Sequence, residues 1–399
     1  MYVKRDAEVL LRKYSEQYPV VTITGPKQSG KTTLCKNLFS NKKYVSLEEF
    51  DNRNYAENDP RGFLAEYCGG VIIDEIQRVP DLLSYIQGVV DRNNIKGEYI
   101  LTGSSQLALT ESVSQSLAGR TALIKLFPFT YTEIYNSVEN SPHWINNVLY
   151  KGFYPRIHSD GLNPTDAMSS YIETYIERDV RQVYNIKDLN IFHRFLQLCA
   201  GRTGQLLNYS NIAGDCGVSV TTIQNWISVL EQSYIIYRLM PFSTNTRKRL
   251  VKSPKIYFYD VGLCAYLNGA RRKEHLYALP NLGSIFENFI ISEVVKMNAH
   301  NNFNHMFYFF RDKIGKEVDL VIDNGLQRFP VEIKAGQTFN SDFIKNLKNY
   351  AALMKSDHLG NLVFSGESQN RTDLSVLNYY DFFNSYSANG YNNAEIEKN

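Results

Sequence analysis

The stretch TGPKQSGKTTL, residues 24–34, follows a run of β-branched residues at 20–24 and leads into a segment with helical spacing. A strand, a glycine-rich loop and a helix in this order predict a phosphate-binding loop, because glycines let backbone N–H groups approach phosphate oxygens at the helix N-terminus. We expect Lys31 to reach the β- and γ-phosphates of a nucleotide and Thr32 to bind Mg²⁺. The predicted nucleotide-binding residues are Gly25, Pro26, Lys27, Gln28, Ser29, Gly30, Lys31, Thr32 and Thr33.

A second motif, GGVIIDEIQRVP at residues 69–80, is typical of a short buried strand that ends in acidic residues. The carboxyl end of such a strand faces the ligand in a parallel sheet. We therefore expect Asp74 to hold Mg²⁺ and Glu75 to polarise the attacking water. Another predicted strand, KYVSLEE at residues 43–49, separates this motif from the loop strand in sequence. That arrangement is typical of ATPases with an added catalytic glutamate.

Polar and basic residues further along the chain are candidates for contact with the γ-phosphate. EYILTGSSQ, residues 98–106, ends a predicted strand with Thr102 and Ser104. Either hydroxyl could sense the phosphate, and a helix-cap or turn role is the alternative. Arg120 is a candidate charge for the same phosphate, in its own chain or from a neighbouring copy, and a surface salt bridge is its alternative.

Together these motifs resemble a known family. With LAGRTALIKLFPFTYTEI, YIERDV, GQLLNYSNIA and SPKIYFYDVGL, they are similar to the prokaryotic AAA-type ATPases that carry a C-terminal domain of unknown function. The resemblance spans about residues 17 to 385, and it implies ATP binding and ATP hydrolysis without a defined substrate. Lys27 departs from the family pattern, which usually has arginine at that position, although the positive charge is retained.

The middle of the chain predicts helices followed by a DNA-binding module. Residues 136–188 are typical of a helical linker region. A short helix, a turn at Gly217 and a helix with Ile223, Ile227 and Leu230 on one face then give helix-turn-helix spacing. Two β-like runs around a basic stretch complete the layout of a winged helix. The predicted phosphate contacts are Arg247, Lys248, Arg249, Lys252 and Lys255, and the candidate base readers are Thr221, Thr222, Gln224 and Asn225.

The C-terminal third has a predicted α-β-β-β-α-β order, which resembles the core of the restriction-endonuclease-like superfamily. Strand alternation in VEIK puts Glu332 and Lys334 on one face, and in EVDLVI it puts Asp319 opposite the apolar side chains. Adjacent strands would present these groups together, with Asp319 and Glu332 as oxygen ligands for Mg²⁺. Lys334 would position water or neutralise charge in the transition state. Glu287, on the preceding helix, could support the metal.

The length of 399 residues favours several domains, and the net charge of +2 gives no general attraction to nucleic acid, so any DNA contact must be local. Short apolar runs and a charged N-terminal segment favour the cytoplasm and no membrane. The scattered cysteines argue against a zinc site. The predicted class is α/β: a P-loop AAA-type ATPase domain (1–135), a helical linker (136–188), a winged-helix domain (189–275), a restriction-endonuclease-like α/β domain (276–385) and a disordered tail (386–399).

These features leave three functions open. The first is an ATPase that controls DNA binding and cleavage by a C-terminal metal site. The second is an ATP-dependent switch or DNA-binding regulator whose nuclease-like domain is catalytically inert and whose winged helix packs on protein or binds DNA. The third is an ATPase that acts on a protein partner without nucleic acid. Arginine donation by a neighbour would require a homo-oligomer, and the sequence leaves the oligomeric state open.

Overall fold

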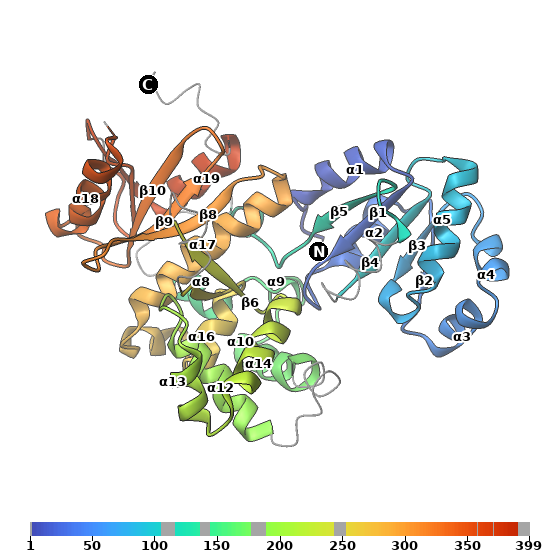
Figure 1. Cartoon of the computed structure of the whole chain (residues 1–399), viewed down its shortest axis with the longest axis horizontal. Coiled ribbons are helices and arrows are strands. Elements are labelled where there is room, and N and C mark those ends of the chain that lie inside the picture. Colours follow the sequence, from blue (N-terminus) through green and yellow to red (C-terminus); the bar gives the residue numbers. More distant parts are fainter. Residues whose placement is uncertain are drawn as a thin grey trace.

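The chain is described by a computed structural model over residues 2–104, 116–135, 144–176, 189–242, 253–356, 358–369 and 371–389. The strands within these ranges form two sheets, one in the N-terminal third and one that joins the middle and C-terminal parts (Figure 1). Within the described ranges, no helix combines the length and the apolar character that crossing a membrane requires.

The N-terminal sheet is parallel throughout, with the strand order β2-β3-β4-β1-β5. The strand of the phosphate loop, β1, is therefore separated from the strand that ends in Asp74, β3, by β4. This arrangement confirms the predicted parallel α/β class. The strands are β1 Val20–Thr24, β2 Lys43–Ser46, β3 Val71–Asp74, β4 Tyr99–Gly103 and β5 Thr121–Lys125.

Helices cover both faces of this sheet, because its strands carry apolar side chains on both faces. In β1, Val21 and Ile23 pack in one buried cluster with residues of α1 and α2, whereas Val20 packs in a second cluster with residues of α4 and α5. The helices are α1 Ala7–Gln17, α2 Lys31–Leu38, α3 Phe50–Asn58, α4 Pro60–Glu66, the 3₁₀ turn η1 Ile76–Arg78 and α5 Leu82–Asn93.

A helix pair in the middle part, α13 and α14, has the predicted helix-turn-helix order. Asn208 and Ser219 cap the two helices by accepting backbone N–H bonds, and Gly217 ends α13 with a φ of +70°. The predicted inward face of α14 is buried. The described helices here are α7 Tyr131–Tyr135, α8 Trp144–Lys151, α9 Pro155–Ser159, α10 Pro164–Tyr171, the π-helical η2 Ile172–Ile176, α12 Leu189–Gly201, α13 Tyr209–Cys216, α14 Val220–Gln232, α16 Val261–Leu267 and the 3₁₀ segment η3 Lys273–Ala278.

The second sheet crosses the predicted boundary at residue 275, because its strand order is β12-β11-β10-β9-β8-β6-β7. The antiparallel pair β6–β7 follows the helix pair, and β6 also pairs in parallel with β8. The order α17-β8-β9-β10-α18-β11 is the one predicted for the C-terminal third. The elements are β6 Ile236–Pro241, β7 Lys255–Phe258, α17 Leu282–Asn301, β8 Met306–Arg311, β9 Glu317–Asp323, β10 Arg328–Lys334, η4 Ser341–Ile344, α18 Lys345–Met354, β11 Asn361–Phe364, β12 Ser375–Asn378 and α19 Tyr379–Asn389.

The final helix, α19, extends into the predicted disordered tail. Phe382, Phe383 and Tyr386 are fully buried, and the Tyr386 ring lies edge-on to Phe303 with 5.6 Å between the ring centroids. Tyr386 lies four positions after Phe382 and three after Phe383, so one helical face buries all of them. The predicted disorder is therefore wrong for residues 386–389. Residues 390–399 lie outside the described part.

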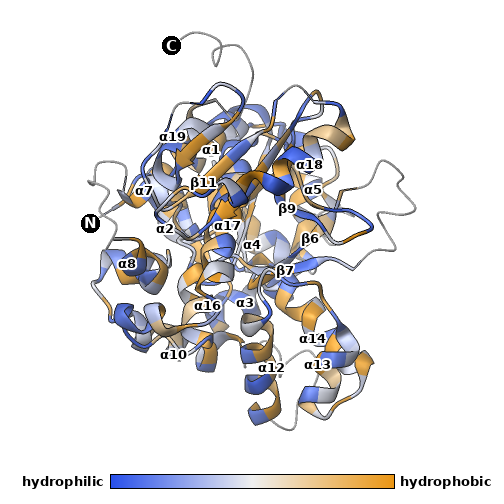
Figure 2. Cartoon of the chain, turned by 90° about the vertical axis from the view of Figure 1, so that its left-hand side faces the viewer, coloured by the Kyte–Doolittle hydropathy of each residue, from blue (hydrophilic) through white to orange (hydrophobic). Residues whose placement is uncertain are grey.

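Helix α17 contacts both the N-terminal part of the chain, which contains the parallel sheet, and the part that contains the second sheet. Figure 2 shows that hydrophobic residues gather along the interior strands and helices and that hydrophilic residues prevail at the periphery. Many residues of α17 are buried in this interior. Its C-terminal half binds the extended segment that follows β5 through alternate residues. In these hydrogen bonds Tyr131 N–H donates to Glu293 Oε2 at 2.6 Å, Lys296 Nζ to Phe129 O at 2.7 Å, and Phe127 N–H to His300 Nε2 at 3.0 Å.

His300 is buried and neutral in this contact, because its Nε2 accepts a hydrogen bond. Burial lowers the pKa of His300 from 6.5 to about 3; Arg5 and Lys296 add to this shift and Glu133 opposes it. Below about pH 6.5 the unfolded chain takes up a proton that the folded chain refuses. This histidine therefore costs stability as pH falls towards 3, by up to about 1.4 kcal/mol per pH unit.

Replacing His300 by glutamine tests this sign. Glutamine retains an acceptor for the Phe127 N–H group and does not titrate. As pH falls from about 7 to about 5, we expect the urea midpoint of His300→Gln to decrease less than that of the parent protein. Identical dependence on pH in the two proteins would show that His300 is not the titrating group.

Candidate functional site

The phosphate loop closes around Lys31. Its Nζ donates to Gly25 O at 2.9 Å and to Pro26 O at 2.8 Å, and its side chain is buried. Burial lowers the pKa of Lys31 to about 8, and the charges of Glu75 and Asp74 oppose the shift. Gly25 is required here, because a Cβ at this position would lie 2.0 Å from Leu126 O. The loop thus holds an ammonium where the sequence predicts contact with phosphate.

Asp74 accepts hydrogen bonds from hydroxyl groups on neighbouring elements. Thr32 Oγ1 donates to its Oδ2 at 2.8 Å, Tyr44 OH donates to the same oxygen at 2.9 Å, and Thr102 Oγ1 donates to Oδ1. Thr32 and Asp74 thus lie together, as predicted for a Mg²⁺ site, and their oxygens suit that ion. Thr102 holds Asp74, a contact that the sequence did not predict. Tyr44 was missed, because a tyrosine in a short strand carries no signal for such a contact.

Glu75 accepts hydrogen bonds from two polar side chains. Ser104 Oγ donates to Glu75 Oε2 at 3.0 Å, and Gln77 Nε2 donates to the same oxygen and to Ser104 Oγ. Glu75 has a φ of +56°, an unfavourable value for a residue with a Cβ. Strained backbone of this kind is concentrated at functional sites. Gln77, which follows the acidic pair in the motif, was not predicted as a site residue.

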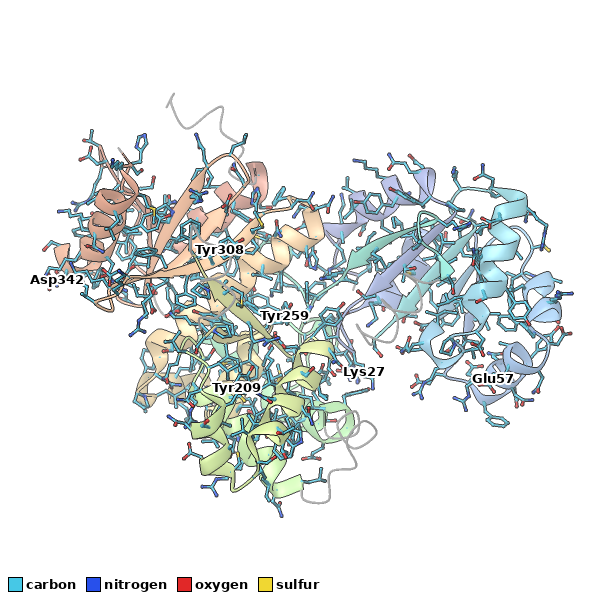
Figure 3. The ribbon with its side chains drawn as sticks, in the orientation of Figure 1. Lys27, Glu57, Tyr209, Tyr259, Tyr308 and Asp342 are labelled. Carbon is cyan, nitrogen blue, oxygen red and sulfur yellow. The ribbon has the colours of Figure 1, made fainter. Side chains whose placement is uncertain are left out.

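A cavity of about 440 Å³ opens above the loop. The loop residues Lys31 and Thr32 line it together with Glu75, and its other side is formed by residues of α9 and η2. Figure 3 shows Lys27 at the junction between the N-terminal body and the helical middle part. The Lys27 ammonium lies 5.5 Å from the centroid of the Tyr175 ring. The nucleotide cavity is therefore built by two parts of the chain.

Arg120 is remote from this cavity within its own chain. It precedes β5 at the amino end of the sheet, where its carbonyl accepts from Val20 N–H, and β1 runs about 13 Å from there to the loop. Its guanidinium pairs with Asp91 on the protein surface, with Nε 2.5 Å from Oδ1. The predicted contact with the γ-phosphate of its own chain is therefore wrong, and the alternative of a surface salt bridge holds.

Arg5 is a buried arginine that the sequence did not identify. It donates to Ser29 O in the phosphate loop at 2.9 Å and to Phe127 O at 2.7 Å, and it pairs with Glu133 at 3.1 Å. These bonds fix the loop to the segment that α17 binds. No spacing rule connects a residue at the start of the chain with a loop 24 positions later, so only the tertiary structure reveals the contact.

A second cluster of charged groups lies on adjacent strands of the C-terminal sheet. Lys334 Nζ lies 2.7 Å from Glu332 Oε1 and 3.6 Å from Asp319 Oδ2, and Asp319 Oδ2 accepts from Ile333 N–H at 2.8 Å. The structure thus brings together the three residues that alternation predicted. Glu332 Oε2 is buried without a hydrogen-bond partner. Burial and the charge of Asp319 raise the pKa of Glu332 to about 8.

Glu287 is bonded to cationic and phenolic groups. Its Oε1 lies 3.1 Å from Lys255 Nζ and 2.5 Å from Tyr257 OH. Burial, with the nearby charge of Asp319, raises the pKa of Glu287 to about 7. Among the described residues, no set of three or more His, Cys, Asp or Glu side chains is arranged to hold a metal ion. The predicted grouping of Glu287 with Asp319 and Glu332 as metal ligands is thus absent here.

Lys255 differs from its prediction as part of an exposed basic loop. It lies in β7 with 3% of its side chain exposed, between Glu287 and Glu317. Lys255 is the first residue of β7, and charge spacing alone could not separate it from the cations that precede it in sequence. The other predicted phosphate contacts, Arg247, Lys248, Arg249 and Lys252, lie outside the described residues.

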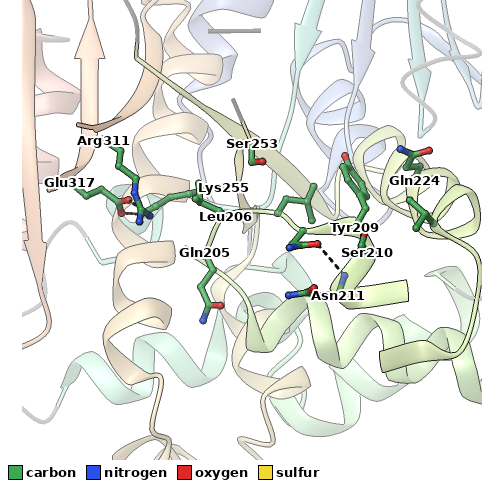
Figure 4. A pocket seen from close by; sticks show the side chains of 14 residues that line it. Gln205, Leu206, Tyr209, Ser210, Asn211, Gln224, Ser253, Lys255, Arg311 and Glu317 are labelled. Carbon is green, nitrogen blue, oxygen red and sulfur yellow. Dashed lines mark hydrogen bonds and ion pairs between the residues drawn. The ribbon is translucent and has the colours of Figure 1, made fainter. Parts of the chain in front are cut away.

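A cavity of about 840 Å³ lies between the helix pair and the charged strands (Figure 4). One side is lined by the first turn of α13 and by Gln224 of α14, and the other by Lys255, Arg311 and Glu317. The loop at Gly204 forms part of the wall, and a Cβ there would lie 3.3 Å from Glu287 Oε1. This cavity therefore extends from the helix pair to the edge of the second cluster.

Comparisons with known proteins divide the chain into three segments. Residues 17–135 match the AAA domain, residues 142–274 match a domain of unknown function (DUF8612), and residues 282–382 match another (DUF4143). The second match spans both the predicted linker and the predicted winged helix.

Curated relatives extend this likeness over most of the chain. The uncharacterized protein Rv2008c of Mycobacterium tuberculosis is 30% identical over 339 residues, which cover 84% of this chain and 74% of the relative. The uncharacterized protein Mb2031c of Mycobacterium bovis has the same identity and coverage. Among solved structures, the Walker-type ATPase paby2304 of Pyrococcus abyssi has a TM-score of 0.43 and 14% identity, covering 66% of this chain and 94% of its own.

Proposed function

We propose, on the premise that this chain belongs to the family of the two mycobacterial proteins and carries an AAA domain, that it couples ATP binding and hydrolysis to the binding and cleavage of DNA. The AAA domain makes the chain a P-loop ATPase, and its loop, acidic strand and cavity fit that activity. The DNA part of the proposal rests on the C-terminal cluster. The observation that carries it is the buried, unpartnered Glu332 Oε2 beside Asp319 and Lys334.

At the nucleotide site, each group is proposed to act where it lies. Thr32 and Asp74 fit Mg²⁺, because a hydroxyl and a carboxylate oxygen already lie 2.8 Å apart. The ion would neutralise charge on the phosphates. Lys31 would exchange its loop carbonyls for phosphate oxygens, and Glu75 would orient the attacking water and accept its proton. Ser104 and Gln77 hold the Glu75 carboxylate for that role.

At the C-terminal cluster, Asp319 and Glu332 fit a divalent cation in part. They supply two carboxylates, and the unpartnered Glu332 Oε2 is an oxygen without a hydrogen-bond donor. Mg²⁺ usually keeps several waters, so a pair of protein carboxylates is a common complement. A cation there would stabilise charge on a scissile phosphate. Lys334 would give its ammonium to the same phosphate.

The cavity in Figure 4 supports a path for the nucleic acid. Gln224 lines it on the side of α14 and was among the predicted base readers. Arg311 lines the opposite side with 45% of its side chain exposed and can meet a phosphate. A strand that follows this cavity would reach the wall at Gly204, beside Glu287. The proposed substrate therefore approaches the cluster from the helix pair.

Helix α17 supports coupling between the two sites. Glu287, next to the cluster, and His300, next to the segment held by Arg5, lie on this one helix. They are 13 residues apart by number, which corresponds to about 20 Å of helix. Since Arg5 also holds Ser29 O, a nucleotide-dependent shift of the loop has a packed route to the cluster.

An alternative function is an ATP-dependent switch or regulator whose nuclease-like domain is inert. The observation that favours it is the internal pairing of Lys334 with both carboxylates and of Lys255 with Glu287, which satisfies charge without a metal. A further alternative is an ATPase that acts only on a protein partner, alone or as a homo-oligomer. Rates of ATP turnover with and without DNA distinguish it from the proposed function.

The test uses the purified full-length chain with linear, circular and single-stranded DNA. We expect DNA to raise the rate of ATP turnover and Mg²⁺ or Mn²⁺ to support DNA cleavage. Lys31→Ala should lose ATP turnover, and its DNA cleavage should no longer respond to ATP. ATP turnover that ignores every DNA would contradict the coupling. DNA binding without cleavage would favour the switch.

A further inference from the structure

Helix α9 stands directly against the phosphate loop. A Cβ on Gly30 would lie 3.7 Å from the ring carbon Cγ of Pro155, the first residue of α9. The next residue, Arg156, lines the nucleotide cavity with Lys31 and Thr32. Arg156 belongs to the segment matched by the domain of unknown function at 142–274, outside the AAA domain. A basic residue from the second part of the chain thus lines the cavity in which the phosphates are expected.

The contact that holds Arg156 is weak and replaceable. Its Nε lies 3.1 Å from Oδ2 of Asp160, the residue that follows α9, and 55% of its side chain is exposed. Exposed pairs of this kind contribute little to stability. A guanidinium binds phosphate by paired N–H bonds that a single carboxylate contact leaves largely unused. A phosphate in the cavity can therefore displace Asp160.

Two other arginines considered for the nucleotide site, Arg5 and Arg120, are held by other groups. Arg5 also lines the cavity, but its guanidinium is fixed by Ser29 O, Phe127 O and Glu133. Arg120 pairs with Asp91 at the far end of the sheet. Arg156 combines a place in the cavity, a partly exposed guanidinium and a surface pair that costs little to break.

We propose that Arg156 binds the terminal phosphate of ATP within its own chain and exchanges Asp160 for that phosphate. The arginine that contacts the γ-phosphate then comes from the second part of the same chain and needs no neighbouring copy. ATP ties α9 to the phosphate loop, and ADP, which lacks the terminal phosphate, releases it. The nucleotide state is thereby read directly by the segment that contains the helix pair.

The test compares two variants that break the same ion pair. Binding of a non-hydrolysable ATP analogue and of ADP to the full chain is measured by calorimetry with Mg²⁺. We expect Arg156→Gln to weaken the ATP analogue by about 10- to 100-fold and ADP by much less, because only ATP loses a charge-assisted contact. Asp160→Asn frees the guanidinium, so we expect it to tighten the ATP analogue by about two- to fivefold. Arg156→Lys should fall between the parent and Arg156→Gln.

Equal effects of Arg156→Gln and Asp160→Asn would overturn the proposal, since a purely structural pair responds alike to the loss of either partner. Equal losses for ATP and ADP would also overturn it. If Arg156→Gln fails to fold, as judged by its thermal melt, the opposite shifts expected for Arg156→Lys and Asp160→Asn carry the test. Affinity for the ATP analogue that falls when the protein is diluted would assign the contact to a neighbouring chain and overturn the proposal.

Discussion

Glu75→Gln is expected to lower the rate constant of ATP hydrolysis by about 10²- to 10⁴-fold, the usual contribution of a positioned general base. Glutamine has the shape of glutamate, so the Ser104 hydroxyl can still donate to its side-chain oxygen. The amide cannot accept a proton from water. Because Lys31, Thr32 and Asp74 are unchanged, we expect the affinity for ATP to stay near that of the parent protein.

Glu48→Gln is the matched control for this prediction. Glu48 also lines the nucleotide cavity, but it is exposed and lies beyond the end of β2 rather than at the end of β3. We expect its hydrolysis rate to stay within about twofold of the parent rate, since surface substitutions of this kind have small effects. Hydrolysis by Glu75→Gln at the parent rate would show that another group activates the water. Loss of ATP binding in Glu75→Gln would instead assign Glu75 to the nucleotide contact.

Local motifs in the sequence predicted the part of the nucleotide site that is continuous along the chain. Lys31 and Thr32 follow from loop spacing, and Asp74 follows from an apolar strand with an acidic end. Arg5 and Arg156 could not be found in this way, because each reaches the cavity from an element distant in sequence. Arg120 is a different case: it directly precedes β5, and in a parallel sheet that position lies at the amino end, away from the loop, so the contact within its own chain could have been excluded from the sequence. Contact with the γ-phosphate of a neighbouring copy stays a prediction.

The second sheet shows a further limit. Alternation predicted the strands that carry Asp319 and Glu332, and the structure brings both carboxylates together with Lys334. Alternation does not state which strands pair. The hydrogen-bonded register between β6 and β8, at Met240 and Tyr308, joins segments that the sequence assigned to separate domains. Lys255 was consequently counted with a loop, although this sheet places it beside the second cluster.

Glu332→Gln is expected to have opposite effects on activity and stability. If the cluster cleaves DNA, loss of a carboxylate ligand should lower metal-dependent cleavage by about 10²-fold or more. The same change removes a buried oxygen that has no partner, close to the like charge of Asp319. The glutamine oxygen can still accept from Lys334 and Asn346, which now bond to Glu332 Oε1. We therefore expect the variant to be more stable by about 1–2 kcal/mol, measured as an increase in melting temperature without divalent metal.

The control for Glu332→Gln is Glu367→Gln, an exposed glutamate that follows β11 in the same part of the chain. It removes the same charge without relieving a buried oxygen, so we expect little change in melting temperature or cleavage. A lower melting temperature for Glu332→Gln would mean that the ion pair with Lys334 outweighs the unpartnered oxygen. If the parent protein binds DNA without cleaving it and Glu332→Gln still has a higher melting temperature, the structural argument is retained and the switch is favoured. A higher melting temperature together with lost cleavage is what a functional site predicts, because such sites retain a buried charge at the expense of stability.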